Sequence, residues 1–181
     1  MTKTGIAVTG AILLLAACRE AGEPAEPVEN QAASAAENEV AAPPLAPPPT
    51  REAALKLMHD RHENMEDIGK ATKAAGRTLK SNSPDLAVIR ASAATYSELA
   101  PHVPSWFPPG TGPDVGKTYA KPAVWEKPED FAQKTRDFQA AVRKFDSAAK
   151  GGDVAAVKAA FGDLGKTCKS CHDSYRTEHK H

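Results

Sequence analysis

The chain has 181 residues, three cysteines and a formal net charge of zero at pH 7. This length suits one domain with a buried core. Residues 19–50 carry Arg19 against six glutamates, whereas residues 51–181 contain four more basic than acidic side chains. The basic residues form no stripe of Lys and Arg along the chain, so nucleic acid binding is not expected.

The first 17 residues are predicted to be a secretion signal. Lys3 precedes an uncharged, mostly apolar run of 13 residues, Gly5 to Ala17. A membrane span usually needs about 18 apolar residues, so a cleaved signal is the better interpretation. The run ends in Leu15-Ala16-Ala17-Cys18, which resembles the lipobox of bacterial lipoproteins. We therefore expect lipidation of Cys18 and a position on the periplasmic side of the inner or the outer membrane. A signal that is cleaved without lipidation would leave the protein free in the periplasm.

Residues 18–50 are predicted to be the lipid-attachment cysteine followed by a disordered tether. The segment is rich in alanine, glutamate and proline, for example "EPAEPVENQAASAAENEVAAPPLAPPPT". It has too few large apolar side chains to offset the entropy of ordering, and its prolines interrupt helices. The tether would hold the domain of residues 51–181 away from a membrane surface.

Two amphipathic helices are predicted in the first half of this domain. The first begins at Arg51, contains no proline, and has an apolar face with Leu57, Met58, Met65, Ile68 and Leu79. The second is predicted to have Ser83 as N-cap and Pro84 at its first position. Its apolar residues are spaced three and four apart, and Pro101 and Pro104 are expected to end it. This stripe consists of Leu86, Ile89, Ala93, Tyr96 and Ala100.

Two further helices follow a loop that is rich in glycine and proline. The third begins near "KPEDF" and ends at Gly151-Gly152; its face carries Phe131, Phe138, Val142 and Phe145. The fourth has Asp153 as predicted N-cap. Its stripe is Val157, Phe161, Leu164, Cys168, Cys171 and Tyr175. With no strand signals, the predicted fold is all-α, an antiparallel four-helix bundle.

The fourth helix contains the motif Cys168-x-x-Cys171-His172, the attachment signature of a c-type haem. On a helix the three residues share one face, so two thiols could join the haem vinyl groups while the imidazole binds the iron. A zinc site would need a second ligand pair. A redox-active cysteine pair is favoured by a βαβ setting and a helix N-terminus. The motif therefore predicts one covalently attached haem c.

The first helix offers candidates for the other face of the iron. Met65 and Met58 are both on its apolar face, and methionine ligation is typical of low-spin haem that transfers electrons. Methionine on an apolar face is also common in cores, so either residue could simply pack. Arg61 is four residues before Met65, and a haem propionate is the expected partner of a buried arginine; a surface arginine is the alternative. His59 and His62 are the other candidate ligands.

The chain resembles the class II c-type cytochromes, the group of cytochrome c′ and cytochrome c-556. The resemblance covers residues 51–181 and rests on "RHENMEDIGKATKA", "PSWFPPGTG", "VWEKPEDF" and "AAFGDLGKTCKSCHDSYR". It implies a four-helix bundle with the haem near the C-terminus. In this group, an Arg-x-x-x-Met pattern matches Arg61 and Met65, and the resemblance to the low-spin c-556 type implies that Met65 is the second iron ligand.

The expected function is that of a mono-haem carrier of single electrons, without enzymatic activity. Membrane-associated redox proteins are the predicted partners, and the lipid anchor would bring them close. Two alternatives remain: a five-coordinate, high-spin cytochrome c′ that binds nitric oxide or carbon monoxide, and a haem-free helical lipoprotein that acts as a scaffold. The sequence leaves both a monomer and a homodimer open.

Overall fold

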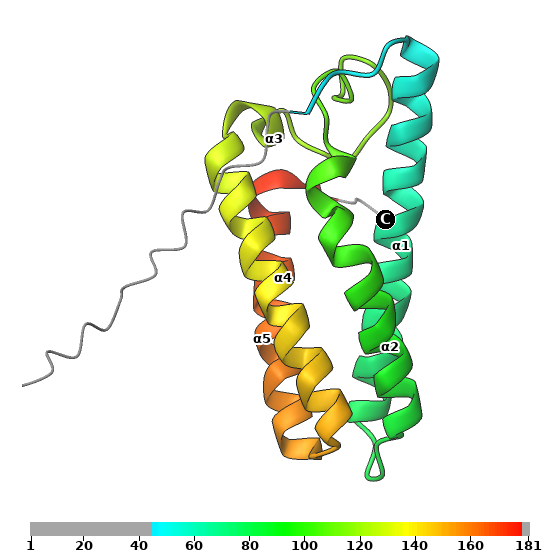
Figure 1. Cartoon of the computed structure of the whole chain (residues 1–181), viewed down its shortest axis with the longest axis vertical. Coiled ribbons are helices and arrows are strands. Elements are labelled where there is room, and N and C mark those ends of the chain that lie inside the picture. Colours follow the sequence, from blue (N-terminus) through cyan, green and yellow to red (C-terminus); the bar gives the residue numbers. More distant parts are fainter. Residues whose placement is uncertain (1–44, 179–181) are drawn as a thin grey trace, which may run out of the picture. The chain divides into compact units, whose positions relative to one another are not determined.

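A computed structural model of the chain describes residues 45–178. Four long helices run antiparallel to their sequence neighbours (Figure 1). They are α1 (Arg51–Leu79), α2 (Leu86–Leu99), α4 (Pro128–Gly151) and α5 (Val154–Tyr175). The described residues form no named strand, only an isolated bridge between Ala120 and Arg176. The prediction of an all-α four-helix bundle is confirmed. The predicted signal, Cys18 and most of the tether lie outside the described residues.

Side-chain caps define where three of the long helices begin. Thr50 accepts a hydrogen bond from Ala53 N at 3.1 Å, and Asp153 accepts one from Ala155 N at 2.9 Å, as predicted for Asp153. The predicted cap of α2 was wrong. Asp85, and not Ser83, is the N-cap, because its carboxylate accepts from Ala87 N at 2.8 Å. A carboxylate oxygen is an effective acceptor for the unpaired N–H groups of a first helical turn.

The segment between α2 and α4 contains more regular structure than its prolines predicted. A 3₁₀ helix, η1 (Ala100–Trp106), continues directly from α2 and includes Pro104. A four-residue helix, α3 (Ala123–Glu126), precedes α4. The prolines therefore change the helix type after α2 and do not stop the helical backbone at once.

The main core lies between the four long helices. Tyr96 and Phe145 are fully buried there and meet edge to face, with ring centroids 5.8 Å apart. A second, smaller cluster forms where α4 begins and α5 ends, and consists of Val124, Phe131 and Tyr175. The tyrosine hydroxyl in this cluster donates a hydrogen bond to Asp130. Together the two clusters position the C-terminal half of α5, which carries the Cys-x-x-Cys-His motif.

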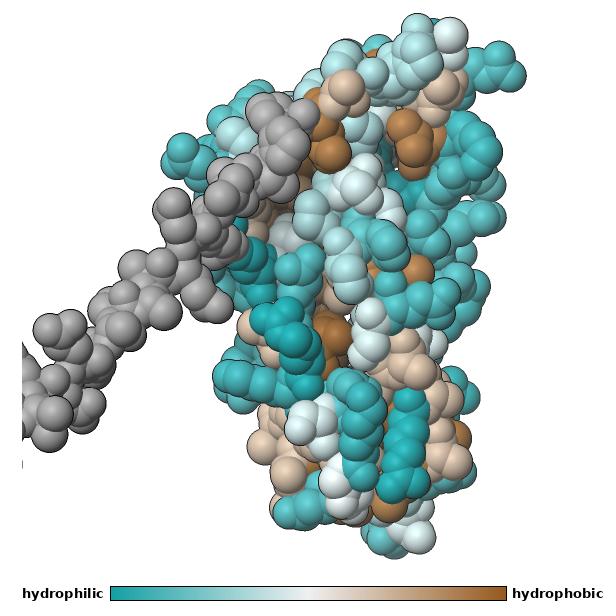
Figure 2. Space-filling view, viewed as in Figure 1, coloured by the Kyte–Doolittle hydropathy of each residue, from teal (hydrophilic) through white to brown (hydrophobic). Residues whose placement is uncertain are grey.

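The face of the bundle that Figure 2 shows is mostly polar. On the face in Figure 2, hydrophilic side chains cover most of the described part, and hydrophobic ones occur in small groups. Within residues 45–178, no helix combines the length and the apolar character that a membrane span requires.

Gly152 ends α4 in the left-handed conformation, with φ 78°. Replacing it with alanine should lower the free energy of unfolding by about 1–2 kcal/mol, because a Cβ atom is strained at positive φ. Gly151→Ala is the matched control, since Gly151 is helical and a Cβ atom there would meet nothing within 4 Å. Denaturant unfolding of both variants tests this; equal stability of the two would contradict the strain argument.

Candidate haem site

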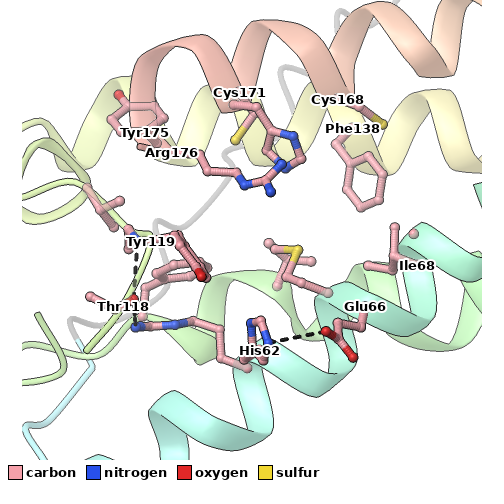
Figure 3. Close-up of a pocket in the computed structure, with 18 of the residues that line it drawn as sticks. His62, Glu66, Ile68, Thr118, Tyr119, Phe138, Cys168, Cys171, Tyr175 and Arg176 are labelled. Atoms are coloured by element: carbon pink, nitrogen blue, oxygen red, sulfur yellow. Dashed lines mark hydrogen bonds and ion pairs between the residues drawn. The ribbon is translucent and has the colours of Figure 1, made fainter. Parts of the chain in front are cut away.

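A cavity of about 1180 Å³ lies between α1 and α5. Residues of α4, of the segment 117–124 and of η1 and its C-terminal end, Val103 and Phe107, also line it. In Figure 3, α5 forms one wall with Cys168 and Cys171, and α1 forms the opposite wall with His62 and Ile68. Pockets for small ligands usually measure about 300–1,000 Å³, so this cavity has room for a large planar group.

The α5 wall brings together the three residues of the predicted attachment motif. Cys168, Cys171 and His172 all line the cavity, and Figure 3 shows both cysteine side chains on the α5 wall, with Cys168 beside Phe138. Both cysteines are partly buried free thiols, Cys168 against the main core and Cys171 against the smaller cluster. This arrangement follows from the helical spacing, because positions i, i+3 and i+4 share a face.

The electrostatics of the two thiols do not suit a redox-active cysteine pair. Burial raises the pKa of Cys171 to about 11 and also raises that of Cys168. Such pairs depend on a lowered thiol pKa, which gives a reactive thiolate. Residues 45–178 contain no group of three or more His, Cys, Asp or Glu side chains that could hold a metal ion.

The two methionines of α1 occupy different parts of the cavity. Met65 is half-buried and packs against the main core, which Cys168 also contacts. Met58 is 6% exposed and lies beside Gly116, in the loop between η1 and α3: a Cβ atom built on that glycine would be 3.4 Å from the methionine Cε and 3.8 Å from its sulfur. Both methionines line the cavity, but only Met65 packs against the same core cluster as Cys168.

The two histidines of α1 are exposed and are engaged with carboxylates. The Nε2 atom of His59 lies 3.3 Å from Glu63 Oε1, and that of His62 lies 3.3 Å from Glu66 Oε1. His62 also lines the cavity, and its ring centroid is 6.1 Å from that of Tyr119. Figure 3 shows the His62–Glu66 contact on the α1 wall.

Arg61 is buried, with 4% of its surface exposed, so the surface-arginine alternative is wrong. Its guanidinium donates to the carbonyl oxygens of Trp106 and Thr111 and to two threonine hydroxyls, at distances between 2.9 and 3.3 Å. It also stacks over Phe107, 4.6 Å from the ring centroid. Burial lowers the pKa of Arg61 to about 10, so the side chain remains charged at neutral pH. No carboxylate within residues 45–178 forms an ion pair with it.

Sequence reasoning did not identify the loop residues that border the site. Lys121 N donates to Tyr175 O and Thr177 N donates to Tyr119 O, each at 2.8 Å, so the loop lies along the end of α5. This pairing places Thr118 and Tyr119 in the cavity lining. No local pattern signals it, because the two segments are more than 50 residues apart in the sequence.

The proteins that this chain is similar to are haem proteins of one family. The family model described as Cytochrome C' matches residues 56–176. Cytochrome c-554 of Cereibacter sphaeroides is 36% identical over 126 residues, which cover 67% of this chain and 80% of the relative. Cytochrome c' of Alcaligenes xylosoxydans xylosoxydans is 35% identical over 128 residues and covers 70% of this chain and 89% of the relative.

Solved structures show the same bundle. Cytochrome c' from Thermochromatium tepidum has a TM-score of 0.64 at 28% identity and covers 69% of this chain and 97% of its own. A nitric oxide complex of a cytochrome c prime mutant from Alcaligenes xylosoxidans has a TM-score of 0.63 at 30% identity, and the match covers 74% of this chain and 100% of the chain in that structure. The family match, the bundle and the cysteine pair in the cavity agree: the chain belongs to the class II c-type cytochromes, and its cofactor is covalently attached haem c.

Proposed function

We propose that this cytochrome carries single electrons with a low-spin haem held by His172 and Met65. Cys168 and Cys171 would form the thioether bonds to the haem. The observation that carries this proposal is that His172 lines the cavity from α5 while Met65 lines it from α1, the opposite wall. Bound haem c supplies an iron that alternates between its ferric and ferrous states, and a thioether ligand favours the ferrous one.

Arg61 would pair with a haem propionate. Its guanidinium is buried, charged and bonded only to neutral oxygen atoms in the described part of the chain. A buried cation without a counter-charge is costly, and a carboxylate at the edge of the cofactor would offset that cost. The loop contacts of Arg61 would at the same time hold the segment that covers this side of the cavity.

A second candidate is a five-coordinate cytochrome that binds nitric oxide or carbon monoxide. Its support is the large cavity and the similarity to cytochromes c', one of which has a solved nitric oxide complex. In this case Met65 would pack beside an open iron site. Neither candidate gives the protein an enzymatic activity.

The cellular setting proposed from the sequence is the periplasmic side of a bacterial membrane. Cys18 would be lipidated, residues 18–50 would form the tether, and the redox partners would be membrane-associated. A homodimer is also consistent with the relatives, since the structure of one similar cytochrome c' is described as having ligand-controlled dimer dissociation.

Absorption spectra of Met65→Ala and Met58→Ala test the proposed ligation. The wild type should show a sharp low-spin spectrum when reduced, a weak far-red sulfur-to-iron band when oxidised, and no response to carbon monoxide. Met65→Ala should lose the far-red band and bind the gas, because the sixth ligand is gone, whereas Met58→Ala should retain the wild-type spectra. High-spin bands in the wild type that shift with carbon monoxide would support the gas-binding candidate instead.

A further inference from the structure

Positively charged side chains surround the haem cavity. Four lysines line it from three parts of the fold, α1, the loop before α3, and α4, and we call them the basic rim: Lys70, Lys73, Lys117 and Lys134. Arg176 lines the cavity from the end of α5, and Figure 3 shows its side chain directed into it. Among the described residues, the one carboxylate in the lining is Glu66, which is engaged with His62.

Most of the charge on this rim is not cancelled by neighbouring carboxylates. Lys73 and Lys117 form no ion pair within residues 45–178, and Lys134 donates to the neutral hydroxyl of Ser170 at 3.1 Å. Lys70 is the exception, since it pairs with Asp67 at 2.7 Å.

Several lysines elsewhere on the helices differ in this respect. They pair with carboxylates three or four residues away, at 2.5–2.7 Å, which reduces their effect on the local potential. These lysines are Lys56, Lys150, Lys166 and Lys169. A positive potential around the cavity is therefore compatible with the zero net charge of the whole chain.

We propose that the basic rim is the docking surface for the electron-transfer partner, and that this partner presents a surface rich in carboxylates. The inference rests on the proposed function, because docking beside the cavity would bring a partner close to the haem. Complementary charges accelerate and orient such encounters. The haem propionates would add negative charge, but the buried cation of Arg61 offsets part of it.

Stopped-flow oxidation of the full-length ferrous protein tests the rim with two reagents of opposite charge. In each reaction the ferrous haem loses one electron, either to ferricyanide, which becomes ferrocyanide, or to the cation tris(phenanthroline)cobalt(III), which becomes cobalt(II). At low ionic strength, the double variant Lys73→Glu/Lys117→Glu should react about tenfold more slowly with ferricyanide and faster with the cobalt cation. Added salt should reduce both differences, since it screens exposed charges.

Lys80→Glu/Lys158→Glu is the matched control. It changes the net charge equally but reverses two exposed lysines that do not line the cavity. The control should stay within about twofold of the wild type, because screening shortens the reach of distant charges. Equal effects of the two double variants would overturn the proposal, since net charge alone would then explain the rates.

Poly-L-glutamate serves as the probe for an acidic protein surface. It should slow the ferricyanide reaction of the wild type, but not that of the Lys73→Glu/Lys117→Glu variant; failure to slow the wild type would contradict the proposed partner.

Replacing the six glutamates of residues 19–50 with glutamine should leave the wild-type rate unchanged. A large increase would mean that the chain's own acidic segment occupies the rim, which would overturn docking of a separate partner. Binding of carbon monoxide to the wild-type haem would contradict the His172/Met65 ligation but not the docking surface. Failure of the proposed ligation can therefore be distinguished from failure of the proposed docking surface.

Discussion

The double variant Cys168→Ala/Cys171→Ala is expected to contain no covalently attached haem. These are the two cysteines that line the cavity, so no other thiol in the described part of the chain can replace them. Because bound haem would bury apolar side chains worth about 1.5–3 kcal/mol each, the variant should also lose on the order of 5 kcal/mol of unfolding free energy. Haem staining after denaturing electrophoresis, mass spectrometry and denaturant unfolding measure the two effects.

Cys18→Ser is the matched control for the cysteine pair. It should retain the haem at wild-type occupancy and lose only the predicted lipid, which partitioning into detergent would detect. Haem that stays bound to the Cys168→Ala/Cys171→Ala variant after denaturation would contradict the assignment of the attachment site.

Arg61→Ala is expected to lower the free energy of unfolding by about 3 kcal/mol. The carbonyl oxygens of Trp106 and Thr111 would lose their guanidinium donors, and an unsatisfied buried acceptor costs about 1–3 kcal/mol. Part of this loss of unfolding free energy is offset, because the variant no longer buries a charged group. The reduction potential should also fall, because a nearby positive charge disfavours the more positive ferric haem. Denaturant unfolding and a spectroscopic redox titration measure these effects.

Arg51→Ala is the control that separates the effect of losing a buried arginine from that of losing a hydrogen bond alone. Arg51 is also on α1 and also donates to a loop carbonyl, Val115 O at 3.0 Å, but it is exposed. Its loss should change stability by no more than about 0.5 kcal/mol and leave the potential unchanged. Arg61→Lys should have a reduction potential close to that of the wild type, because it retains the positive charge. Its free energy of unfolding should still fall, because a lysine cannot reproduce the forked donors of a guanidinium. An unchanged potential in Arg61→Ala would contradict the propionate contact.

Local patterns predicted most of the helical structure, because amphipathic spacing and capping depend on neighbouring residues. The start of α1 at Arg51, the Asp153 cap of α5 and the end of α4 at Gly152 agree with the sequence analysis. The start of α2 does not, since Ser83 and Asp85 are both good caps by residue type. The backbone N–H of Asp85 also donates to Thr78 Oγ1 at 2.6 Å, a contact with the preceding helix that helps to select this residue.

The sequence by itself determined the all-α bundle and the Cys168-x-x-Cys171-His172 face, since both depend on helical spacing within one segment. Only the tertiary structure decided which groups meet that face. It turned Arg61 inward onto Thr111 and Thr118, separated the surroundings of Met65 from those of Met58, and gathered the basic rim around one cavity. The physical reason is that these contacts join segments dozens of residues apart, and they arise when the helices pack their apolar faces together.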